Sequence, residues 1–467
     1  MSKVTRVQKS KLNLSTRIDA EHYSPRFIPV LRRLTSLQAV KLRRTLIEPV
    51  KTGHTPSTKN AAYYNPKVVK FIKTDNLRED RIDTYDVQLL SELGNSKIGA
   101  SELRTDDVIV TIIGATEQII GRAARVHIDM GRANINQNIA LIRSHVPAGY
   151  LTVFLNSHYG REQLIWLSRQ TGQVNLNCRE VEELAIPLFS NEFTETIHNL
   201  NSERHRLLFD SVQIYSQAER LLLSELGFQD WKPSHTLAYV RKYSQSVRAR
   251  RMDAEHFQPK YREMFDRLNV EATLISLGRL VTPIKGIEVG GAAYTDSGIP
   301  FWRVSNLTIH GLDDSSLNYI SNENYELLRS YYEPRQGELL LSKDATPGVA
   351  FYLETPIQGI ISSGILRLKI VNKIPPHYLE VVLNSIFVQL QIEQSAGGSV
   401  IRHWKPSEVQ KTLIPRLATE KEEEISTLIQ QSHATRRQAK VLLEKAKRAV
   451  EIAIEEGEEN ALTLSNE

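Results

Sequence analysis

The sequence is nearly free of cysteine. Cys178 is the single cysteine among 467 residues, which excludes an internal disulfide and any zinc site built from several cysteines. Long apolar runs are also missing, because the longest, residues 108–113, is far shorter than the roughly 20 residues of a membrane helix. The basic N-terminus is not followed by the apolar stretch of a signal peptide. These absences favour a soluble, cytoplasmic protein with no membrane partner.

Signatures of catalysis and of cofactor binding are absent too. There is no Gly-x4-Gly-Lys-Ser/Thr phosphate loop, no Asn/Asp-Pro-Pro-Tyr/Phe methyltransferase loop, and no His-x3-His or His-Glu-x2-His among the 13 histidines. Glu21-His22 returns as Glu255-His256, but an acid beside a histidine at the start of a helix more often caps and packs than catalyses. We therefore expect no enzyme activity, no cofactor and no metal.

The composition is that of a folded protein with a mild basic excess. Hydrophobic residues make up 41% and charged residues 24%, the net charge is +5, and the sequence pI is about 9.0. A chain of this length is expected to form two to four domains. The basic balance permits a polyanionic partner without identifying one.

An internal repeat is the most informative feature of the sequence. Residues 17–34 return at 251–268 with Asp-Ala-Glu-His unchanged. Four more pairs follow in the same order, namely 69–77 with 299–307, 104–111 with 335–342, 135–143 with 361–369, and 149–157 with 377–385. Five ordered matches predict that the two halves are one diverged domain, with insertions in the loops.

Each half predicts the same α+β plan. A short helix is followed by β-rich stretches, at 68–72, 108–113 and 139–142 in the first half and at 301–304, 339–341 and 365–370 in the second. A second helix, a polar loop containing glycine, an Ile-Pro pair and a long helix then close each half.

The closing helices carry a coiled-coil pattern. Positions alternately three and four apart recur at an offset of 228 residues: 197, 200, 204, 207, 211, 214, 218, 221 and 225, then 425, 428, 432, 435, 439, 442, 446, 449 and 453. One amphipathic helix alone would more simply belong to a bundle core. Two in register predict an antiparallel pair that holds two domains apart.

These features together resemble the specificity subunit of type I restriction-modification enzymes over nearly the whole chain. The shared motifs are the paired Asp-Ala-Glu-His segments, Gly-His-Thr-Pro-Ser at 53–57, FIKTDNL at 71–77, FWRVSNL at 301–307, the Gly-x-Val loops at 172–174 and 398–400, and Ile-Pro at 186–187 and 414–415. The second half departs from the pattern at 285–288, where Lys-Gly-Ile-Glu replaces Gly-His-Thr-Pro-Ser.

The resemblance implies an architecture and a set of partners. It implies target-recognition domains at 1–189 and 229–416, long conserved helices at 190–228 and 417–456, and a tail at 457–467, arranged with pseudo-two-fold symmetry. The partners would be double-stranded DNA with an asymmetric split site, two adenine-methylating subunits docked on the helices, and restriction subunits. The helix pair would set the spacing between the half-sites.

Candidate DNA contacts lie in three loops of each half, where donors and acceptors for bases or phosphates follow predicted strands. The candidates are Lys73, Thr74, Gln118, Arg122, Arg125, Gln173, Asn175, Asn177 and Arg179 in the first half, and Arg303, Ser305, Lys343, Ser399, Arg402, His403 and Lys405 in the second. The 134–138 stretch could also face the DNA groove. Asn76 and Asn306 fit a shared turn better than base reading.

Two other functions stay open on the sequence. The chain could be the recognition region of a fused or orphan methyltransferase or nuclease, although no catalytic domain precedes it. It could instead be a coiled-coil interaction scaffold with no DNA role, which would explain the helices but not the two matching domains with polar loops.

Overall fold

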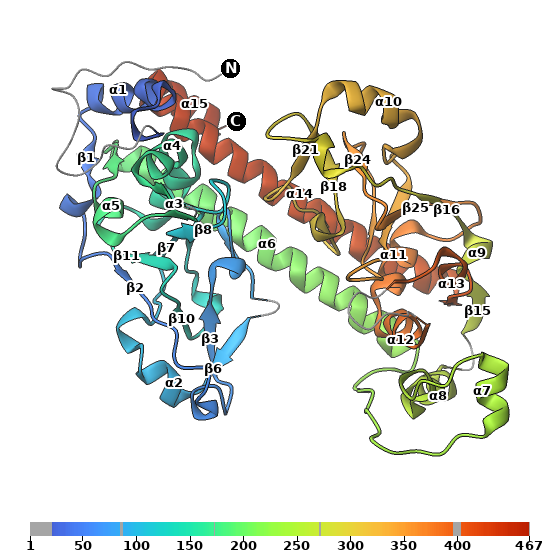
Figure 1. Cartoon of the computed structure of the whole chain (residues 1–467). Helices are drawn as coiled ribbons and strands as arrows, with labels where there is room; N and C mark the ends of the chain where they lie inside the picture. The colour runs from blue at the N-terminus through green and yellow to red at the C-terminus, as the bar shows by residue number, and fades with distance from the viewer. Residues whose placement is uncertain (1–20, 85–86, 172, 270–271, 396–402, 467) are drawn as a thin grey trace. The chain divides into compact units, whose positions relative to one another are not determined.

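The computed structural model describes residues 21–84, 87–171, 173–269, 272–395 and 403–466 (Figure 1). The chain has a mixed α and β fold and divides into two compact units. Unit 1 joins the residues up to Leu207 to those from Gln438 onward, and unit 2 comprises Leu208–Arg437. Within the described residues, no helix is long and apolar enough to cross a membrane.

Two long helices are each shared between the units. Helix α6 (Asn191–Glu225) begins in unit 1 and ends in unit 2, whereas α14 (Thr419–Glu455) begins in unit 2 and ends in unit 1. Both end before a glycine with a left-handed backbone, Gly227 at φ 81° and Gly457 at φ 109°. Glycine adopts this conformation without the steric cost that a Cβ atom would bring, so it commonly ends a helix.

The buried stripe of each long helix differs in part from the predicted coiled-coil positions. Positions 197, 204, 211 and 218 of α6 are buried as predicted, but the buried positions between them are 201, 215 and 222 rather than 200, 214 and 221. In α14 the same shift by one residue replaces 428 and 442 by 429 and 443. The sequence spacing therefore located the stripe but not its centre, since neighbouring positions share the wide apolar face of a 3.6-residue helix.

Unit 1 contains five small sheets. Their strand orders are β2-β11-β7-β9, β10-β3-β6, β12-β13-β8, β1-β14 and β4-β5. The strands are β1 (Val40–Lys41), β2 (Lys51–Thr52), β3 (Val69–Ile72), β4 (Leu77–Arg78), β5 (Arg81–Ile82), β6 (Gln88–Leu90), β7 (Val108–Thr111), β8 (Ile113–Gly114), β9 (Ala123–Arg125), β10 (Ala133–Ile135), β11 (Ile139–Ile142), β12 (Arg169–Thr171), β13 (Gln173–Asn175) and β14 (Ala185–Ile186). Strands β7 and β11 are buried along their whole length, as their continuous apolar sequences predict.

The helices of unit 1 share a core with the end of α14. They are α1 (Ile28–Ser36), α2 (Glu92–Ser96), α3 (Ala148–Asn156), α4 (His158–Leu167), α5 (Cys178–Glu182) and α15 (Glu458–Asn466). Phe193 and Ile197 of α6 pack in the same cluster as Ala446, Val450 and Ile454 of α14. The small side chains of α14 leave room for close approach to this core.

Unit 2 contains four sheets, with strand orders β16-β25-β22-β23, β17-β21-β18-β24, β15-β26 and β19-β20. The strands are β15 (Thr273–Ser276), β16 (Val281–Lys285), β17 (Tyr294–Thr295), β18 (Ile299–Trp302), β19 (Leu307–Thr308), β20 (Gly311–Leu312), β21 (Asn318–Ile320), β22 (Glu338–Ser342), β23 (Ala350–Tyr352), β24 (Ile360–Ile361), β25 (Ile365–Ile370) and β26 (Leu413–Arg416). Strand β22 is wholly buried at the centre of the largest sheet.

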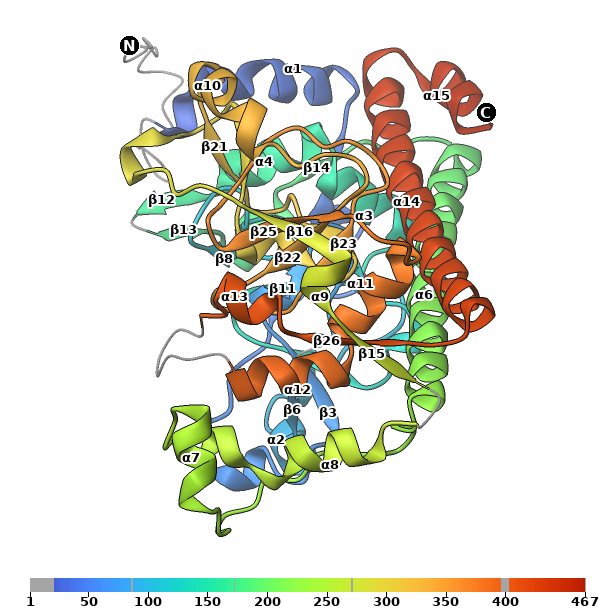
Figure 2. The same cartoon turned by 90° about the vertical axis from the view of Figure 1, so that its right-hand side faces the viewer.

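The helices of unit 2 are α7 (Tyr243–Ala249), α8 (Pro259–Arg267), α9 (Leu277–Leu280), α10 (Asn322–Tyr332), α11 (Pro376–Asn384), α12 (Ile386–Ser395) and α13 (Pro406–Val409). Helix α8 lies beside α12 in both views (Figures 1 and 2), and Lys260 Nζ donates to Glu393 Oε1 at 2.7 Å between them. Tyr215 and Leu222 of α6 share a core cluster with Ile425 of α14. Inside this unit, Ser432 of α14 donates its hydroxyl to the Ser211 carbonyl of α6 at 2.7 Å.

Candidate nucleic-acid interface

The first candidate loop of unit 1 follows strand β3. Lys73 precedes a short 3-10 turn at Thr74–Asn76, and its backbone N–H donates to Asn76 Oδ1 at 3.0 Å. The Lys73 ammonium lies 5.8 Å from the centre of the Phe71 ring, a cation–π contact that leaves the side chain partly exposed. Thr74 is half-buried. Asn76 thus has a turn-forming contact, and Lys73 keeps an accessible charge.

The second and third loops of unit 1 are brought together by strand pairing. β8 and β13 are antiparallel, with Ile113 opposite Asn175. Gln118 in the second loop is exposed, and Asn175 in the third is half-buried. The side chain of Gln173 lies outside the described residues. Sequence spacing alone could not show this contact, because the two loops are about 60 residues apart.

Arg122 and Arg125 are occupied by contacts inside the protein. Arg122 is buried, and its Nε donates to the Gln118 carbonyl at 3.1 Å. Arg125 pairs with Asp106 at 2.6 Å and donates to Ser202 Oγ of α6 at 2.7 Å. The sequence analysis placed both on an open loop, but the segment folds back as strand β9 and carries these guanidinium groups inward.

Asn177 and Arg179 lie at the start of helix α5. Asn177 caps the helix, because its Oδ1 accepts the Glu180 N–H at 3.0 Å while the Glu180 carboxylate accepts the Asn177 N–H at 2.8 Å. Arg179 is exposed in the first turn. Capping explains the polar residue at 177, whereas Arg179 keeps its donors at the surface.

The first loop of unit 2 carries Arg303 and Ser305. Arg303 is half-buried and donates its backbone N–H to Asn306 Oδ1 at 3.0 Å, while Ser305 is exposed. Asn306 is buried and donates Nδ2 to the carbonyls of Asp313 and Ser316 at 3.0 and 3.1 Å. Its role is to hold the following β19–β20 hairpin.

The other candidates of unit 2 meet around Asp344. Lys343 Nζ lies 2.5 Å from Asp344 Oδ2, and His403 Nδ1 lies 2.8 Å from Asp344 Oδ1. The Trp404 N–H donates to the Lys343 carbonyl at 2.9 Å, which ties the two loops together. His403 and Lys405 are exposed. Ser399 and Arg402 lie outside the described residues.

The remaining polar stretch of unit 1 is structural in part. Asn134 is fully buried and donates Nδ2 to Asn95 Oδ1 at 2.8 Å, so it cannot reach a DNA groove from this position. Gln137 is exposed, and Thr55 Oγ1 donates to its Oε1 at 2.6 Å. The Thr55 loop was not among the predicted contacts, although its Gly-His-Thr-Pro-Ser sequence marked it.

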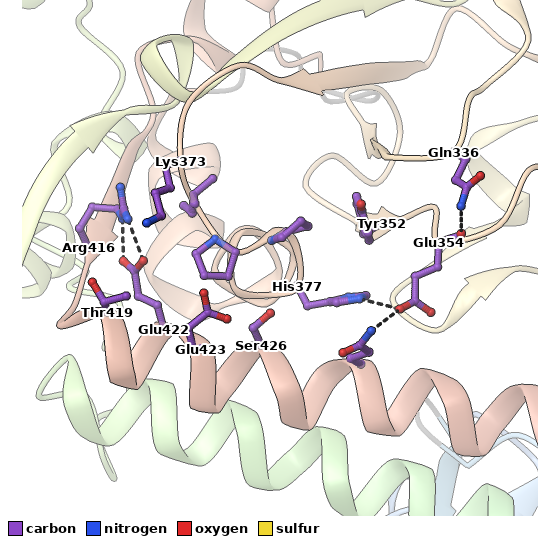
Figure 3. A pocket seen from close by; sticks show the side chains of 14 residues that line it. Gln336, Tyr352, Glu354, Lys373, His377, Arg416, Thr419, Glu422, Glu423 and Ser426 are labelled. Atoms are coloured by element: carbon purple, nitrogen blue, oxygen red, sulfur yellow. Dashed lines mark hydrogen bonds and ion pairs between the residues drawn. The ribbon is translucent and has the colours of Figure 1, made fainter.

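A group of possible metal ligands lies elsewhere in unit 2, beside a pocket of about 620 Å³ (Figure 3). His377, Glu380 and His433 converge there, each buried. Burial lowers the pKa of His377, but hydrogen bonds to Glu380 and Glu354 outweigh burial and raise it overall. The same bonds, with that of Arg437, hold the pKa of Glu354 below its usual range despite burial.

The fold and the loops define a mixed α and β protein of two units, in which polar loops gather at strand ends. No family model matches the chain. The type I restriction enzyme EcoBI specificity subunit of Escherichia coli is 23% identical over 194 residues, which cover 40% of this chain and 35% of that protein. The match spans about a third of the relative's length.

Two solved structures are similar in fold over most of their length. The S subunit of a type I restriction-modification system from M. genitalium has a TM-score of 0.36 and 12% identity, covering 91% of this chain and 94% of the other. The HsdS subunit of Thermoanaerobacter tengcongensis has a TM-score of 0.29 and 15% identity, covering 90% and 96%. With the sequence match, the resemblance to type I specificity subunits is confirmed.

Proposed function

We propose that this chain is the DNA-recognition subunit of a type I restriction-modification complex in the cytoplasm, without a catalytic centre of its own. Each of its two domains reads one half of an asymmetric bipartite site. The observation that carries the proposal is a repeated framework of buried hydrogen bonds that holds loops of different sequence in the two halves.

The first support is a pair of tyrosines 228 residues apart. Tyr150 donates its hydroxyl to the Pro187 carbonyl at 2.8 Å, and Tyr378 donates to the Pro415 carbonyl at 2.8 Å. Both tyrosines are fully buried, and both prolines belong to the predicted Ile-Pro junctions. Equal partners at a constant offset favour duplication, because unrelated folds would not preserve them.

Paired asparagines give the second support. Asn156 Nδ2 donates to the Ala123 carbonyl at 2.8 Å, and its Oδ1 accepts the Ala123 N–H at 3.1 Å. Asn384 makes the same two bonds with Ala350, both at 2.9 Å. A side-chain amide that satisfies both backbone groups of a strand residue fixes a helix to that strand.

The loops at 53–57 and 285–288 also fit one plan despite their different sequences. A Cβ atom on Gly53 would lie 1.7 Å from the Ile135 carbonyl oxygen, and one on Gly286 would lie 2.1 Å from the Ser362 carbonyl oxygen. Both positions need glycine for this close approach. The replacement noted at 285–288 therefore keeps the residue on which the backbone contact depends.

The side chains at the loop tips differ between the halves, which supports asymmetric half-sites. Lys73 and Thr74 in unit 1 occupy the place of Arg303 and Val304 in unit 2, on the same turn. Sequence is read through donor and acceptor patterns on base edges, so different tips select different bases.

We assign the contacts most readily to the accessible candidates. These are Lys73, Gln118, Asn175, Arg179, Arg303, Ser305, Lys343, His403 and Lys405. Thr74 is half-buried beside Lys73, and Asn177 contributes a helix cap. Arg122 and Arg125 support their loop from below through the contacts described above. Gln173, Ser399 and Arg402 remain candidates on sequence grounds.

The long helices suit a spacer and a docking platform. At 1.5 Å per residue, the 35 residues of α6 extend about 52 Å, longer than the roughly 34 Å of one DNA turn. We propose that the pair fixes the unread gap between half-sites and binds two methyltransferase subunits, to which restriction subunits add.

Methylation mapping tests the proposal. Cells that carry this chain with its methyltransferase subunits are expected to show one split adenine-methylated motif, which disappears when the gene is deleted. Replacing Lys73 and Gln118 by alanine should relax one half of the motif, whereas replacing Lys343 and Lys405 should relax the other. A motif that does not depend on this chain, or changes in the same half for both variants, would contradict the proposal.

The alternatives are separated by two simple assays. A fused or orphan enzyme would require the purified chain alone to modify or cut DNA in the presence of S-adenosylmethionine. An interaction scaffold would show no shift of duplex DNA even in complex with its partners. Only a DNA-recognition subunit binds DNA in the complex and lacks activity alone.

A further inference from the structure

The buried polar cluster of unit 2 has the composition of a metal site. His377 and Glu380 lie one turn apart on α11, and His433 reaches them from α14. Glu380 Oε2 lies 2.9 Å from His377 Nδ1, and Glu380 Oε1 lies 2.7 Å from His433 Nε2. One ligand atom from each of the three residues falls within 4.8 Å of the others. All three side chains are more than nine-tenths buried, and Glu380 is fully so.

A second layer of contacts orients this cluster. Glu354 Oε1 lies 3.0 Å from His377 Nε2, on the side of the ring away from Glu380. Gln430 donates to Glu354 at 3.2 Å, and Arg437 forms an ion pair with it. A carboxylate on the far nitrogen of a ligating histidine is the common support of metal sites, because it fixes the tautomer and the ring orientation.

We propose that His377, Glu380 and His433 bind one Zn²⁺ ion, with Glu354 holding His377 in place. Two imidazoles and one carboxylate form a ligand set that zinc takes in proteins. The ion replaces the two protons that the imidazoles now share with Glu380. Ligand atoms around tetrahedral zinc stand about 3.3 Å apart, so each imidazole retreats by a few tenths of an ångström.

Access and surroundings fit an ion of this kind. His377 and Glu354 both line the pocket of about 620 Å³, and Figure 3 shows the His377 ring pointing toward the Glu354 carboxylate. Behind the cluster, the Phe351 ring lies 5.0 Å from the His433 ring. An apolar wall strengthens the attraction between a cation and a buried carboxylate. The inference does not depend on the proposed role in DNA recognition.

Zinc titration of the untagged full chain, freed of metal by EDTA, tests the proposal. We expect one equivalent of Zn²⁺ per chain, a Co²⁺ derivative with the intense visible absorption of four-coordinate cobalt, and thermal stabilisation by zinc. Glu354→Gln should keep one equivalent but bind about 10–100-fold more weakly. His433→Gln, which removes a ligand, should bind more weakly still. His158→Gln, an exposed control in unit 1, should bind like the wild type.

The proposal fails if the wild-type chain binds zinc no more tightly than His433→Gln does. It also fails if the Co²⁺ derivative shows only the weak absorption of six-coordinate cobalt. The cobalt spectrum is recorded on the wild-type chain, so it decides the question even if His433→Gln does not fold. A protonated His377 between two carboxylates would then account for the cluster.

Discussion

A buried ion pair in unit 1 offers a sharp test of how the recognition loops are held. Asp80 occupies the turn of the β4–β5 hairpin, directly after the Lys73 loop, with a left-handed backbone at φ 52°. Its Oδ2 lies 3.0 Å from Arg204 Nη1 of α6, and Asn201 Nδ2 donates to its Oδ1 at 2.8 Å. The two charged side chains are only 1% and 8% exposed. Burial raises the pKa of Asp80, and the Arg204 charge offsets part of that effect.

Arg204→Met removes the cation and leaves the carboxylate alone in the interior. Breaking one side of a buried pair costs about 3–5 kcal/mol of unfolding free energy. The pKa of Asp80, already above its unfolded value, should rise further in this variant. Above that folded-state pKa the full cost applies, and below it the folded state holds a proton and the cost shrinks. The destabilisation should therefore be smaller at pH 5 than at pH 7.5.

Adding Asp80→Asn to Arg204→Met should restore part of the loss, since no charge is then buried. Asparagine tolerates the left-handed backbone as aspartate does, so the hairpin is kept. We expect the double variant to lie about 1–2 kcal/mol below the wild type. Trp166 is in unit 1, and the other three tryptophans lie in unit 2. Urea unfolding followed by fluorine NMR of 5-fluorotryptophan can thus follow unit 1 alone.

Two results would refute this reasoning. One is a loss of less than about 1 kcal/mol in Arg204→Met, which would mean that the pair is hydrated and weak. The other is a double variant no more stable than Arg204→Met, because the two side chains would then be energetically independent.

Three further predictions concern single residues. Burial lowers the pKa of His127 to about 2, so the neutral ring is favoured in the folded state, and stability should fall below pH 6.5 by about 1.4 kcal/mol at pH 5.5; His127→Gln should flatten that part of a stability–pH curve. Gly286→Ala should lower the melting temperature because its Cβ meets backbone, whereas Gly290→Ala, with nothing within 4 Å, should not. Lys73→Ala should weaken DNA binding by the complex equally for all sequences and reduce the salt slope by about 1; a change in base preference would contradict the phosphate role.

The sequence was a good guide to the framework because buried strands and helices leave periodic apolar patterns. The stretches at 108–113, 139–142 and 365–370 correspond to β7, β11 and β25 within a few residues. The long helices were also readable, although the centre of their buried stripe was shifted. A repeat multiplies such signals, because two weak patterns in register support each other.

The candidate interface was less predictable because exposure depends on tertiary contacts. Arg122 follows a predicted strand exactly as a loop cation would, yet the chain turns back and buries it. The pairing of Ile113 with Asn175 and of Asp344 with His403 has no periodicity to announce it. The metal ligands His377, Glu380 and His433 span two elements, so no spacing motif could mark them.

The sequence repeat and the compact units also divide the chain differently, with a consequence for folding. By the repeat, residues 1–189 form a complete domain, but the core of unit 1 includes Ala446, Val450, Ile454 and Ala461 from the far end of the chain. Apolar burial at about 25 cal/mol per Å² has to outweigh the entropy of ordering the chain, and without these residues the helix-facing side of that core is open to water. Unit 1 therefore depends on contacts across more than 400 residues of sequence, and such non-local closure is slow. Unit 2, whose core is continuous between Leu208 and Arg437, carries no such dependence, so the second half of the repeat is the better candidate for folding on its own.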